Sequence, residues 1–352
     1  MMIPDIQVKQ IYRLPAYGTW KETVHVFDAR TALALQAAWL AERPLLVRGD
    51  PGTGKSQLAR AAAVALGWEL VSEVVSAHTE IQDLWYRFDA VSRLGQAQLL
   101  SVLADKADAK LLQTALDPKK FLSPGVLWWA YAWQTAECYY QASECKSYHP
   151  NPNHALNLTA SSAELPKGVV LLIDEIDKAD ADLPNSLLET LDNARFRIPW
   201  VNESIGYHAD DPKALRPLVV ITTNEDRQLP AAFVRRCLVL HLELPETEDE
   251  LVAYLVQRGE EHFSKGDGTC LFEPPILEQA ARQLYADRGQ ASALGMKPPG
   301  QAEYLDLLRV LARMNLSTAE QLQRLVDIQD FALKKHPGMK QRQTLSGEAG
   351  EP

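Results

Sequence analysis

The sequence lacks the features of secreted and membrane-inserted proteins. Its four cysteines include no CxxC pair, so a reduced, cytoplasmic setting is expected. The longest apolar runs, at 126–133 and 169–173, are far too short to span a bilayer. The N-terminal stretch MMIPDIQVKQ does not show the charged-then-apolar order of a secretory signal. We therefore expect a cytoplasmic protein without a membrane-spanning segment.

Basic residues are also in short supply. The 36 Lys and Arg are outnumbered by 46 Asp and Glu, which gives a formal net charge of −10 at pH 7. This balance argues against a protein that mainly coats nucleic acid, because such binding depends on clustered Lys and Arg, although it leaves room for a local basic groove. A hydrophobic fraction of 46% and a charged fraction of 23% are typical of globular domains.

Short apolar runs alternate with helical patterns as far as residue 245. The run VVLLI at 169–173 is continuous, as in strands that are buried on both faces of a parallel sheet. Helices are expected at 27–42, with Asp28 as the N-cap, and at 57–66. We predict an α/β fold with helices on both faces of a parallel five-stranded sheet, whose strands lie at 45–47, 69–75, 169–173, 218–222 and 238–242.

From residue 247 onward the pattern is helical. The apolar spacing predicts helices at 248–262, 275–288, 302–314 and 318–335, which together indicate a smaller all-helical domain. The last residues are rich in Gly, Pro and polar side chains, which favours disorder. The predicted organisation is therefore an N-terminal segment at 1–26, an α/β core at 27–245, a helical domain at 246–336 and a disordered tail at 337–352.

A glycine-rich loop follows the first core strand. It fits GxxxxGK[ST] with Gly49, Asp50, Pro51, Gly52, Thr53, Gly54, Lys55 and Ser56. Glycines let successive backbone N–H groups surround phosphate oxygens, and the next helix directs its positive end at them. Lys55 is expected to reach the β- and γ-phosphates and Ser56 to bind Mg²⁺. A chance match occurs in about one in a hundred such chains. The strand before it and the helix after it favour a triphosphate site at residues 49–57, with Gln57 as its last member.

Acidic and amide side chains follow two of the other predicted strands. Asp174 and Glu175 end the buried run, and ligands of open parallel sheets bind at that edge. We assign Asp174 to Mg²⁺ and Glu175 to polarising the attacking water. Asn224 follows strand 218–222, where its amide can sense the γ-phosphate; a turn-forming Asn is the simpler alternative. The stretch 224–226 also lacks the Asn-Lys-x-Asp pattern of many GTPases, which favours ATP.

In this order the motifs resemble those of the AAA+ ATPases, and most closely the MoxR-like branch. The matching stretches beyond the glycine loop lie at 76–94, 122–130, 171–199 and 218–237, and the resemblance covers roughly residues 25–315. It implies a P-loop αβα core with a helical lid, assembled into a homo-oligomeric ring that is usually a hexamer. ATP then lies between neighbouring subunits.

The resemblance also implies cations that complete the site. An arginine from the next subunit stabilises charge on the transferred phosphoryl group. The matching doublet is Arg235 and Arg236, of which register favours Arg236 as the finger. The residues alone fit equally well a solvated basic pair at a helix end. Many AAA+ lids add a sensing arginine within a Gly-Ala-Ser-Pro-Arg-Ala-like string. This chain has GMKPPGQA at 295–302, so Lys297 is the nearest cation.

The branch further implies an insert at about 86–124 and a hairpin at about 195–216, elements that point toward the ring's pore and touch the remodelled partner. Trp85, Tyr86 and Phe88 could make such contacts, and aromatic core packing explains them at least as well. The same holds for the aromatic run at 128–140, where few Lys or Arg are interleaved for base stacking. Nearby polar residues do not have zinc-finger spacing and are expected to be metal-free: Cys138, Cys145, His149 and His154.

The resemblance therefore implies an ATPase that hydrolyses ATP with Mg²⁺ to remodel or activate a partner protein. By family analogy that client carries a von Willebrand A domain. A nucleic-acid motor or defence-system AAA+ NTPase is one alternative, which the acidic balance disfavours. A slow nucleotide-gated switch or scaffold is another, which the presence of Glu175 disfavours and the lid's missing arginine favours.

Overall fold

The computed structural model describes residues 6–103, 113–145, 147–150, 165–207, 216–265, 268–314 and 316–332. The chain forms two compact units. Unit 1 comprises Met1–Glu22, Phe27–Val47 and Leu58–Leu240, and unit 2 comprises Thr23–Val26, Arg48–Gln57 and His241–Pro352. The glycine loop thus groups with the C-terminal helices, whereas the acidic strand end at 174–175 belongs to unit 1.

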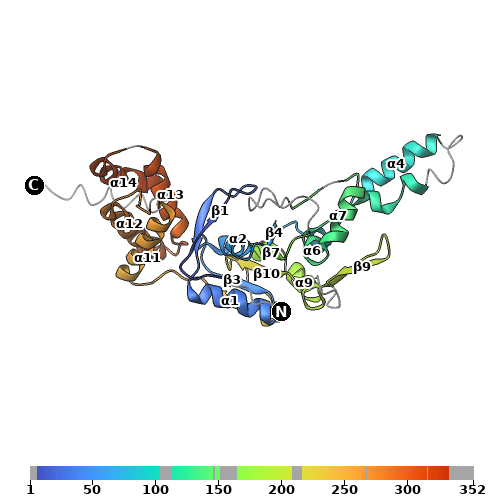
Figure 1. Ribbon diagram of the computed structural model, residues 1–352, viewed down its shortest axis with the longest axis horizontal. Helices are drawn as coiled ribbons and strands as arrows, with labels where there is room; N and C mark the ends of the chain where they lie inside the picture. Colours follow the sequence, from blue (N-terminus) through green and yellow to red (C-terminus); the bar gives the residue numbers. More distant parts are fainter. Residues whose placement is uncertain are drawn as a thin grey trace, which may run out of the picture. The chain divides into compact units, whose positions relative to one another are not determined.

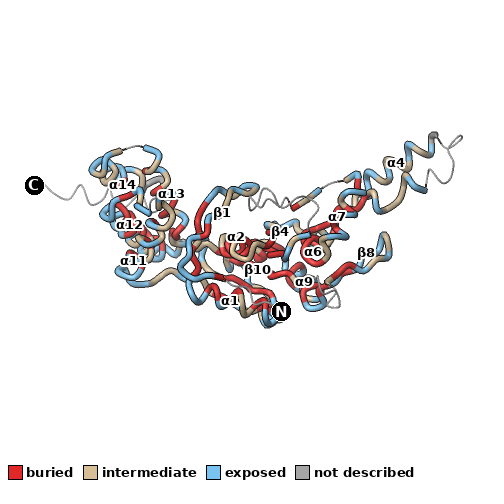
Figure 2. The backbone as a smooth tube through the Cα atoms, in the orientation of Figure 1, coloured by how far each residue is buried: buried red, intermediate tan, exposed pale blue. Residues whose placement is uncertain are grey.

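A five-stranded parallel sheet organises the core, which confirms the predicted fold. Its order is β11-β3-β10-β7-β4. Every residue of the central strands β7 and β10 is buried, which explains their uninterrupted apolar runs. Figure 2 shows this burial along the strands. The bounds are β3 (Leu45–Arg48), β4 (Glu69–Val74), β7 (Val169–Asp174), β10 (Leu218–Thr223) and β11 (Leu238–His241).

Helices flank the sheet, as Figure 1 shows. Helix α1 (Ala29–Leu40) begins as predicted, because the Asp28 carboxylate accepts a hydrogen bond from Thr31 N at 2.7 Å. Helix α2 (Lys55–Leu66) follows the glycine loop and buries a row of alanines. Small side chains allow this helix to pack close to its neighbours. Helices α9 (Asp182–Asn193) and α10 (Ala231–Arg236) follow β7 and β10 in the chain.

Within the expected insert and hairpin ranges, unit 1 carries two small antiparallel ladders. One joins β5 (Tyr86–Phe88) to β6 (Leu122–Pro124), and the other joins β8 (Arg195–Ile198) to β9 (Glu203–Gly206). Residues 104–112 of the insert range and 208–215 of the hairpin range lie outside the described residues. The remaining elements of this region are α3 (Ile81–Trp85), α4 (Ala90–Leu103), η2 (Pro118–Phe121), α6 (Val126–Tyr131) and α7 (Trp133–Ala142).

The aromatic side chains of this region form a core. Trp128 and Trp129 of α6 are fully buried, so this run packs internally. The Trp85 ring stacks on Phe196 with centroids 5.8 Å apart, and its Nε1 donates to Thr190 Oγ1 at 2.9 Å. Trp85 at the end of α3 therefore packs on the hairpin, and Phe88 of the insert does so as well, since its ring stacks on Trp200 with centroids 4.0 Å apart.

The N-terminal segment at 1–26, for which the sequence predicts no helix or strand, contains two short strands, β1 (Ile11–Leu14) and β2 (Thr23–Val26). Each has only four residues, which is too few to establish a two-residue period in the sequence.

Unit 2 contains the predicted C-terminal helices around a core of its own. They are α11 (Glu248–His262), α12 (Pro274–Ala293), α13 (Gln301–Arg313) and α14 (Thr318–Ala332). Leu255, Leu277, Tyr304 and Leu308 are among its fully buried side chains. Residues 333–352, which include the predicted tail, lie outside the described part of the chain. The domain boundary at 245/246 stays a prediction.

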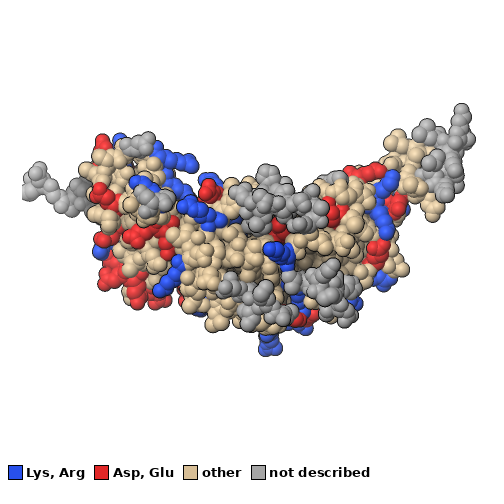
Figure 3. Space-filling view, viewed as in Figure 1, with Lys and Arg blue, Asp and Glu red and all other residues tan. Residues whose placement is uncertain are grey.

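The described residues carry the acidic surface charge and the short apolar runs that the sequence predicts. Figure 3 shows acidic side chains gathered on the C-terminal helices, and α11 alone begins with Glu248, Asp249 and Glu250. Among the described residues, no helix combines the length and apolarity that crossing a bilayer requires.

Candidate functional site

The glycine loop has a backbone that only glycine adopts readily. Gly49, Gly52 and Gly54 have φ values of +147°, +80° and +91°. A Cβ at Gly49 would lie 2.3 Å from the carbonyl oxygen of Leu242, closer than any real contact. The motif's glycines are therefore favoured by the local backbone conformation.

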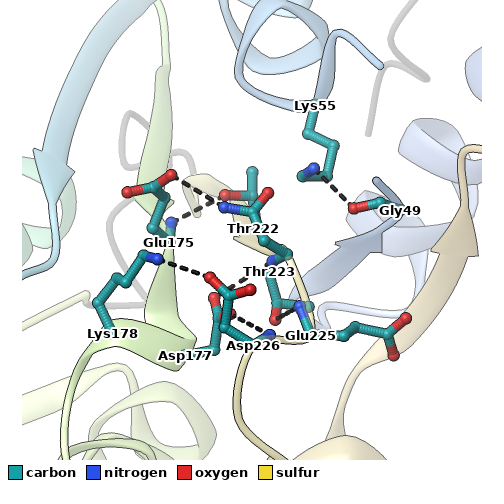
Figure 4. A network of polar contacts seen from close by, with 10 residues as sticks. Gly49, Lys55, Glu175, Asp177, Lys178, Thr222, Thr223, Glu225 and Asp226 are labelled. Carbon is teal, nitrogen blue, oxygen red and sulfur yellow. Dashed lines mark hydrogen bonds and ion pairs between the residues drawn. The ribbon is translucent and has the colours of Figure 1, made fainter. Parts of the chain in front are cut away.

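The Lys55 ammonium lies against the loop itself. Its Nζ donates to the carbonyl oxygens of Gly49 and Asp50, both at 2.8 Å, and the residue is only 6% exposed. Figure 4 shows Lys55 extending toward Gly49. Burying a cation in this way is favourable only with acceptors around it, and the loop carbonyls supply them.

Within unit 2 the loop packs on the start of α13. Ala302 N donates to Gly52 O at 3.1 Å, and a Cβ at Gly52 would meet Glu303 Oε2 at 3.1 Å. Glu303 in turn accepts from Gly300 N at 2.9 Å, which closes the first turn of the helix. The conformation of the loop is thus set partly by a helix about 250 residues away in sequence, which no local pattern could show.

The acidic strand end lies in unit 1 and is cross-linked to the neighbouring strand. Asp174 is 7% exposed and accepts from Thr222 Oγ1 at 2.5 Å, while Glu175 N donates to the same oxygen at 2.9 Å. Glu175 itself has left-handed backbone angles, φ 58° and ψ 48°, which are uncommon for a residue with a side chain. Strain of this kind is often found where a side chain must be aimed.

The structure brings Glu175 and Asn224 together. Asn224 Nδ2 donates to Glu175 Oε1 at 2.9 Å, an arrangement drawn in Figure 4. The two residues follow adjacent parallel strands, β7 and β10, whose carboxyl ends share one edge of the sheet. An amide donor at this distance fixes the direction in which the carboxylate faces.

Two residues that sequence reasoning missed complete this edge. Thr222 bridges Asp174 and Glu175 as described above, and Asp177 accepts from the backbone of the turn after β10, from Asn224 N at 3.2 Å and Asp226 N at 2.9 Å. The visible signals were the Thr-Thr pair at the end of an otherwise apolar strand and a third acid three residues after Asp174.

A cavity of about 490 Å³ opens beside these acids. Glu175, Asp177 and Lys178 line it, together with Val75, Ser76, Ala77, Asp226 and Arg227. Lys178 Nζ forms an ion pair with Asp226 at 2.6 Å, and this hydrogen bond raises the pKa of Lys178 above its ordinary value. The cavity is thus lined by three carboxylates and two cations on one part of its wall, and by Val75, Ser76 and Ala77 on the rest.

The arginine doublet lies at the exposed end of α10. Arg236 Nε forms an ion pair with Asp192 at 2.7 Å, and its side chain is 48% exposed. The guanidinium of Arg43 donates to the backbone carbonyls of Arg235 and Arg236. The end of the helix is therefore anchored through its backbone, while both arginine side chains face outward.

Lys297 lies in the exposed loop between α12 and α13. The next helix begins with Gln301, which is 8% exposed and accepts from Tyr254 OH at 2.8 Å. Arg288, one turn before the end of α12, donates to Pro299 O at 2.6 Å. Burial lowers the pKa of Arg288, while the nearby Asp50 carboxylate opposes that effect. The Asp50 carboxylate and the Arg288 guanidinium thus interact electrostatically within unit 2.

The remaining candidates lie elsewhere. Phe88 stacks on Trp200 at 4.0 Å, and Tyr86 is 4% exposed. Cys145 Sγ donates to Asp89 at 3.4 Å, and His149 contacts Glu137 at 3.0 Å. His154 lies outside the described residues. In the ranges that the structure does describe, no group of three His, Cys, Asp or Glu side chains is arranged to hold a metal ion.

Each unit separately carries residue types that suit a nucleoside triphosphate with Mg²⁺. In unit 2 the glycine loop offers backbone N–H groups, the Lys55 ammonium and the Ser56 hydroxyl, and in unit 1 the Asp174 carboxylate is a hard oxygen donor of the kind that Mg²⁺ takes alongside water. The Glu175 carboxylate is oriented by an amide donor, and a carboxylate is a residue type that can act as a general base.

Residues 44–237 match the family model described as AAA domain (dynein-related subfamily), and this is more than half of the chain. The chain belongs to the AAA family. The AAA match contains the glycine loop, the acidic strand end, Asn224 and the arginine doublet, whereas Lys297 lies beyond it. Members of this family are ATPases that bind nucleotide, typically with Mg²⁺, and typically form oligomeric rings.

Two solved structures match this chain at low similarity. A point mutant of RuvB from Thermotoga maritima is 16% identical, with a TM-score of 0.36 over 80% of this chain and 68% of that one. A proposed ATPase from Cytophaga hutchinsonii is 14% identical, with a TM-score of 0.35 over 86% of this chain and 79% of that one. A comparison with curated proteins gave no match.

Proposed function

We propose that this chain is a MoxR-like AAA+ ATPase that hydrolyses ATP with Mg²⁺ in a ring, usually a hexamer in this branch, and uses the energy to remodel a protein client. The observation that carries the proposal is the Glu175 carboxylate held at 2.9 Å by the Asn224 amide, next to the buried Asp174. A nucleotide-binding scaffold would not need a general base aimed in this way.

Each residue then has a defined task. Residues 49–57 bind the triphosphate, with Lys55 leaving the loop carbonyls for the β- and γ-phosphates. Ser56 and Asp174 hold Mg²⁺, which supplies charge neutralisation at the phosphates. Glu175 orients and deprotonates the attacking water, and Asn224 aligns Glu175 and contacts the γ-phosphate.

A neighbouring subunit of the ring supplies a further positive charge to the bound phosphates. Arg236 of one subunit acts on the phosphoryl group bound by its neighbour, with Arg235 at the interface. The outward direction of both side chains and the backbone anchoring by Arg43 support this role. Lys297 is the cation proposed for the lid, at 246–336, where its single point charge allows weaker γ-phosphate sensing than a guanidinium would.

The client is a protein, in a cytoplasmic setting. By the MoxR-like analogy it carries a von Willebrand A domain and meets the insert and hairpin. The stacking of Phe88 in the insert on Trp200 in the hairpin, with ring centroids 4.0 Å apart, supports a shared contact surface formed by these two elements. The acidic charge of the chain disfavours a nucleic-acid client.

An ATPase assay with its matched controls tests the proposal. Purified protein should hydrolyse ATP with Mg²⁺, and Glu175→Gln should bind ATP without turnover and shift to a larger assembly by light scattering. Glu189→Gln, an exposed acid on α9, should behave as wild type. Strong stimulation of hydrolysis by single- or double-stranded DNA would instead favour a nucleic-acid motor.

A further inference from the structure

We propose that Asp177 is a positioning residue for catalysis, which holds Asn224 so that Asn224 can aim Glu175. The proposal rests on the proposed ATPase function and adds a residue that the motifs do not assign. Asp177 itself does not contact the substrate in this proposal.

The geometry links Asp177 to the chemistry in two steps. Asp177 Oδ1 accepts from Asn224 N at 3.2 Å, and Oδ2 accepts from Asp226 N at 2.9 Å. The side chain of the same Asn224 then donates to Glu175 Oε1 at 2.9 Å. One carboxylate therefore fixes the backbone of the residue whose amide orients the general base. Figure 4 shows the Asp177 carboxylate beside Asp226, with a dashed line to the Asp226 backbone nitrogen.

Both oxygens of Asp177 are used in this task. The residue is 1% exposed, and a carboxylate can accept a hydrogen bond at each of its two oxygens. The two backbone N–H groups give each buried oxygen a donor. An amide in the same place would keep one acceptor and present an NH₂ group to the second N–H donor, so one contact would become repulsive.

The turn also needs an external support. Glu225, between the two bonded residues, has a φ of +57°, a conformation that costs energy for a residue with a side chain. Glu225 N donates to Thr223 Oγ1 at 3.0 Å within the turn. The ion pair of Lys178 with Asp226 adds to it from outside, but its side chains are 41% and 32% exposed, and exposed pairs contribute little. Asp177 is a buried contact that helps to fix where Asn224 lies.

Kinetics of Asp177→Asn test the proposal. Turnover should fall about tenfold to a hundredfold, because the general base is no longer held in position. The affinity for ATP should stay within about threefold of the wild-type value. Asp180→Asn removes a charge from the same segment, but that carboxylate is 84% exposed and bound to Arg227. This control should keep wild-type turnover. Wild-type turnover in Asp177→Asn, or an equal loss in Asp180→Asn, would overturn the proposal.

A double-mutant cycle separates positioning from general structural support. If Asp177 acts through Asn224, then Asp177→Asn combined with Asn224→Ala should turn over no more slowly than Asn224→Ala alone. Multiplication of the two losses in the double variant would show that Asp177 acts independently, which contradicts the proposal.

Hydrogen exchange gives a readout that needs neither ATP nor a folded variant. In wild-type protein, residue-resolved exchange at the amides of Asn224 and Asp226 should be slow, because both are bonded to a buried acceptor. Exchange at the rate of an open turn would overturn the positioning role even if ATP is hydrolysed. Slow exchange in a protein without ATPase activity would instead refute the proposed function and leave the geometry standing.

Discussion

Glu175 and Asn224 are joined across two adjacent parallel strands by a hydrogen bond of 2.9 Å from the Asn224 amide to the Glu175 carboxylate. The bond joins the residue that we propose as general base to the residue that we propose as sensor of the γ-phosphate. Since Glu175 also sits in left-handed backbone conformation, its direction is determined twice, by its own backbone and by its neighbour. The proposed mechanism of ATP hydrolysis depends on this pair.

Loss of the loop lysine should abolish nucleotide binding. Lys55→Ala removes the ammonium that we expect at the β- and γ-phosphates. Wild-type protein at saturating ATP and Mg²⁺ should gain about 2.7 kcal/mol of stability at a hundredfold excess over the dissociation constant. Thermal unfolding of Lys55→Ala should show no ATP-dependent shift. A shift equal to that of wild type would remove Lys55 from the phosphate site.

The first motif glycine should be far less replaceable than a glycine at a helix end. In Gly49→Ala the new Cβ would lie 2.3 Å from Leu242 O at a φ of +147°, so we expect a loss of at least about 3 kcal/mol in the free energy of unfolding. Gly67 also has a positive φ, of +63°, but meets nothing within 4 Å, so Gly67→Ala should cost about 1 kcal/mol. Urea denaturation measures both. Equal losses would contradict the close approach at Gly49.

The arginine doublet should act between subunits. Arg236→Ala should keep ATP affinity and lose at least about a hundredfold in turnover, because the transferred phosphoryl group loses its positive partner. Mixing Arg236→Ala with Lys55→Ala subunits should restore part of the activity, since some sites then combine an intact loop with an intact finger. If the mixture is only as active as the two variants measured separately and added together, Arg236 acts within its own chain. There its observed partner is Asp192.

Mild acid should destabilise the C-terminal helices through His262. Burial, with smaller effects from the charges of Arg309 and Arg258, lowers the pKa of His262 to about 4 from 6.5. Between pH 6.5 and pH 4 the His262 imidazole is therefore protonated in the unfolded chain and neutral in the folded one. The stability that is present above pH 6.5 is lost as the pH falls toward 4.

From pH 7 to pH 5 the loss from His262 should be about 2 kcal/mol. His262→Gln should show a correspondingly smaller fall in the free energy of unfolding by urea. Glu69, whose pKa burial raises to about 7, changes stability in the opposite direction over this range, so the comparison must be between the two proteins. Identical pH dependence in both would exclude His262 as the cause.

The sheet could be predicted because β7 and β10 are buried on both faces, which leaves uninterrupted apolar runs in the sequence. The N-cap at Asp28 and the helix at 248–262 were predicted for the same kind of local reason. Strands β1 and β2 were not, because four residues do not establish a period.

The site was predictable only as far as its motifs extend. Residues 49–57, Asp174, Glu175 and Asn224 follow from local patterns at strand ends. The role of Asp177 depends on backbone N–H groups 47 and 49 residues further along the chain. The packing of Gly52 on Ala302 is more distant still. Such contacts are set by tertiary structure, which a single sequence does not display.

The central claim is that Glu175 activates the water that attacks ATP. Single-turnover hydrolysis of γ-labelled ATP, by wild-type and Glu175→Gln protein with every site filled, measures this step without product release. We predict equal ATP binding in the two proteins and phosphate release at least about a hundredfold slower in Glu175→Gln. Phosphate release at the wild-type rate from Glu175→Gln would contradict the account.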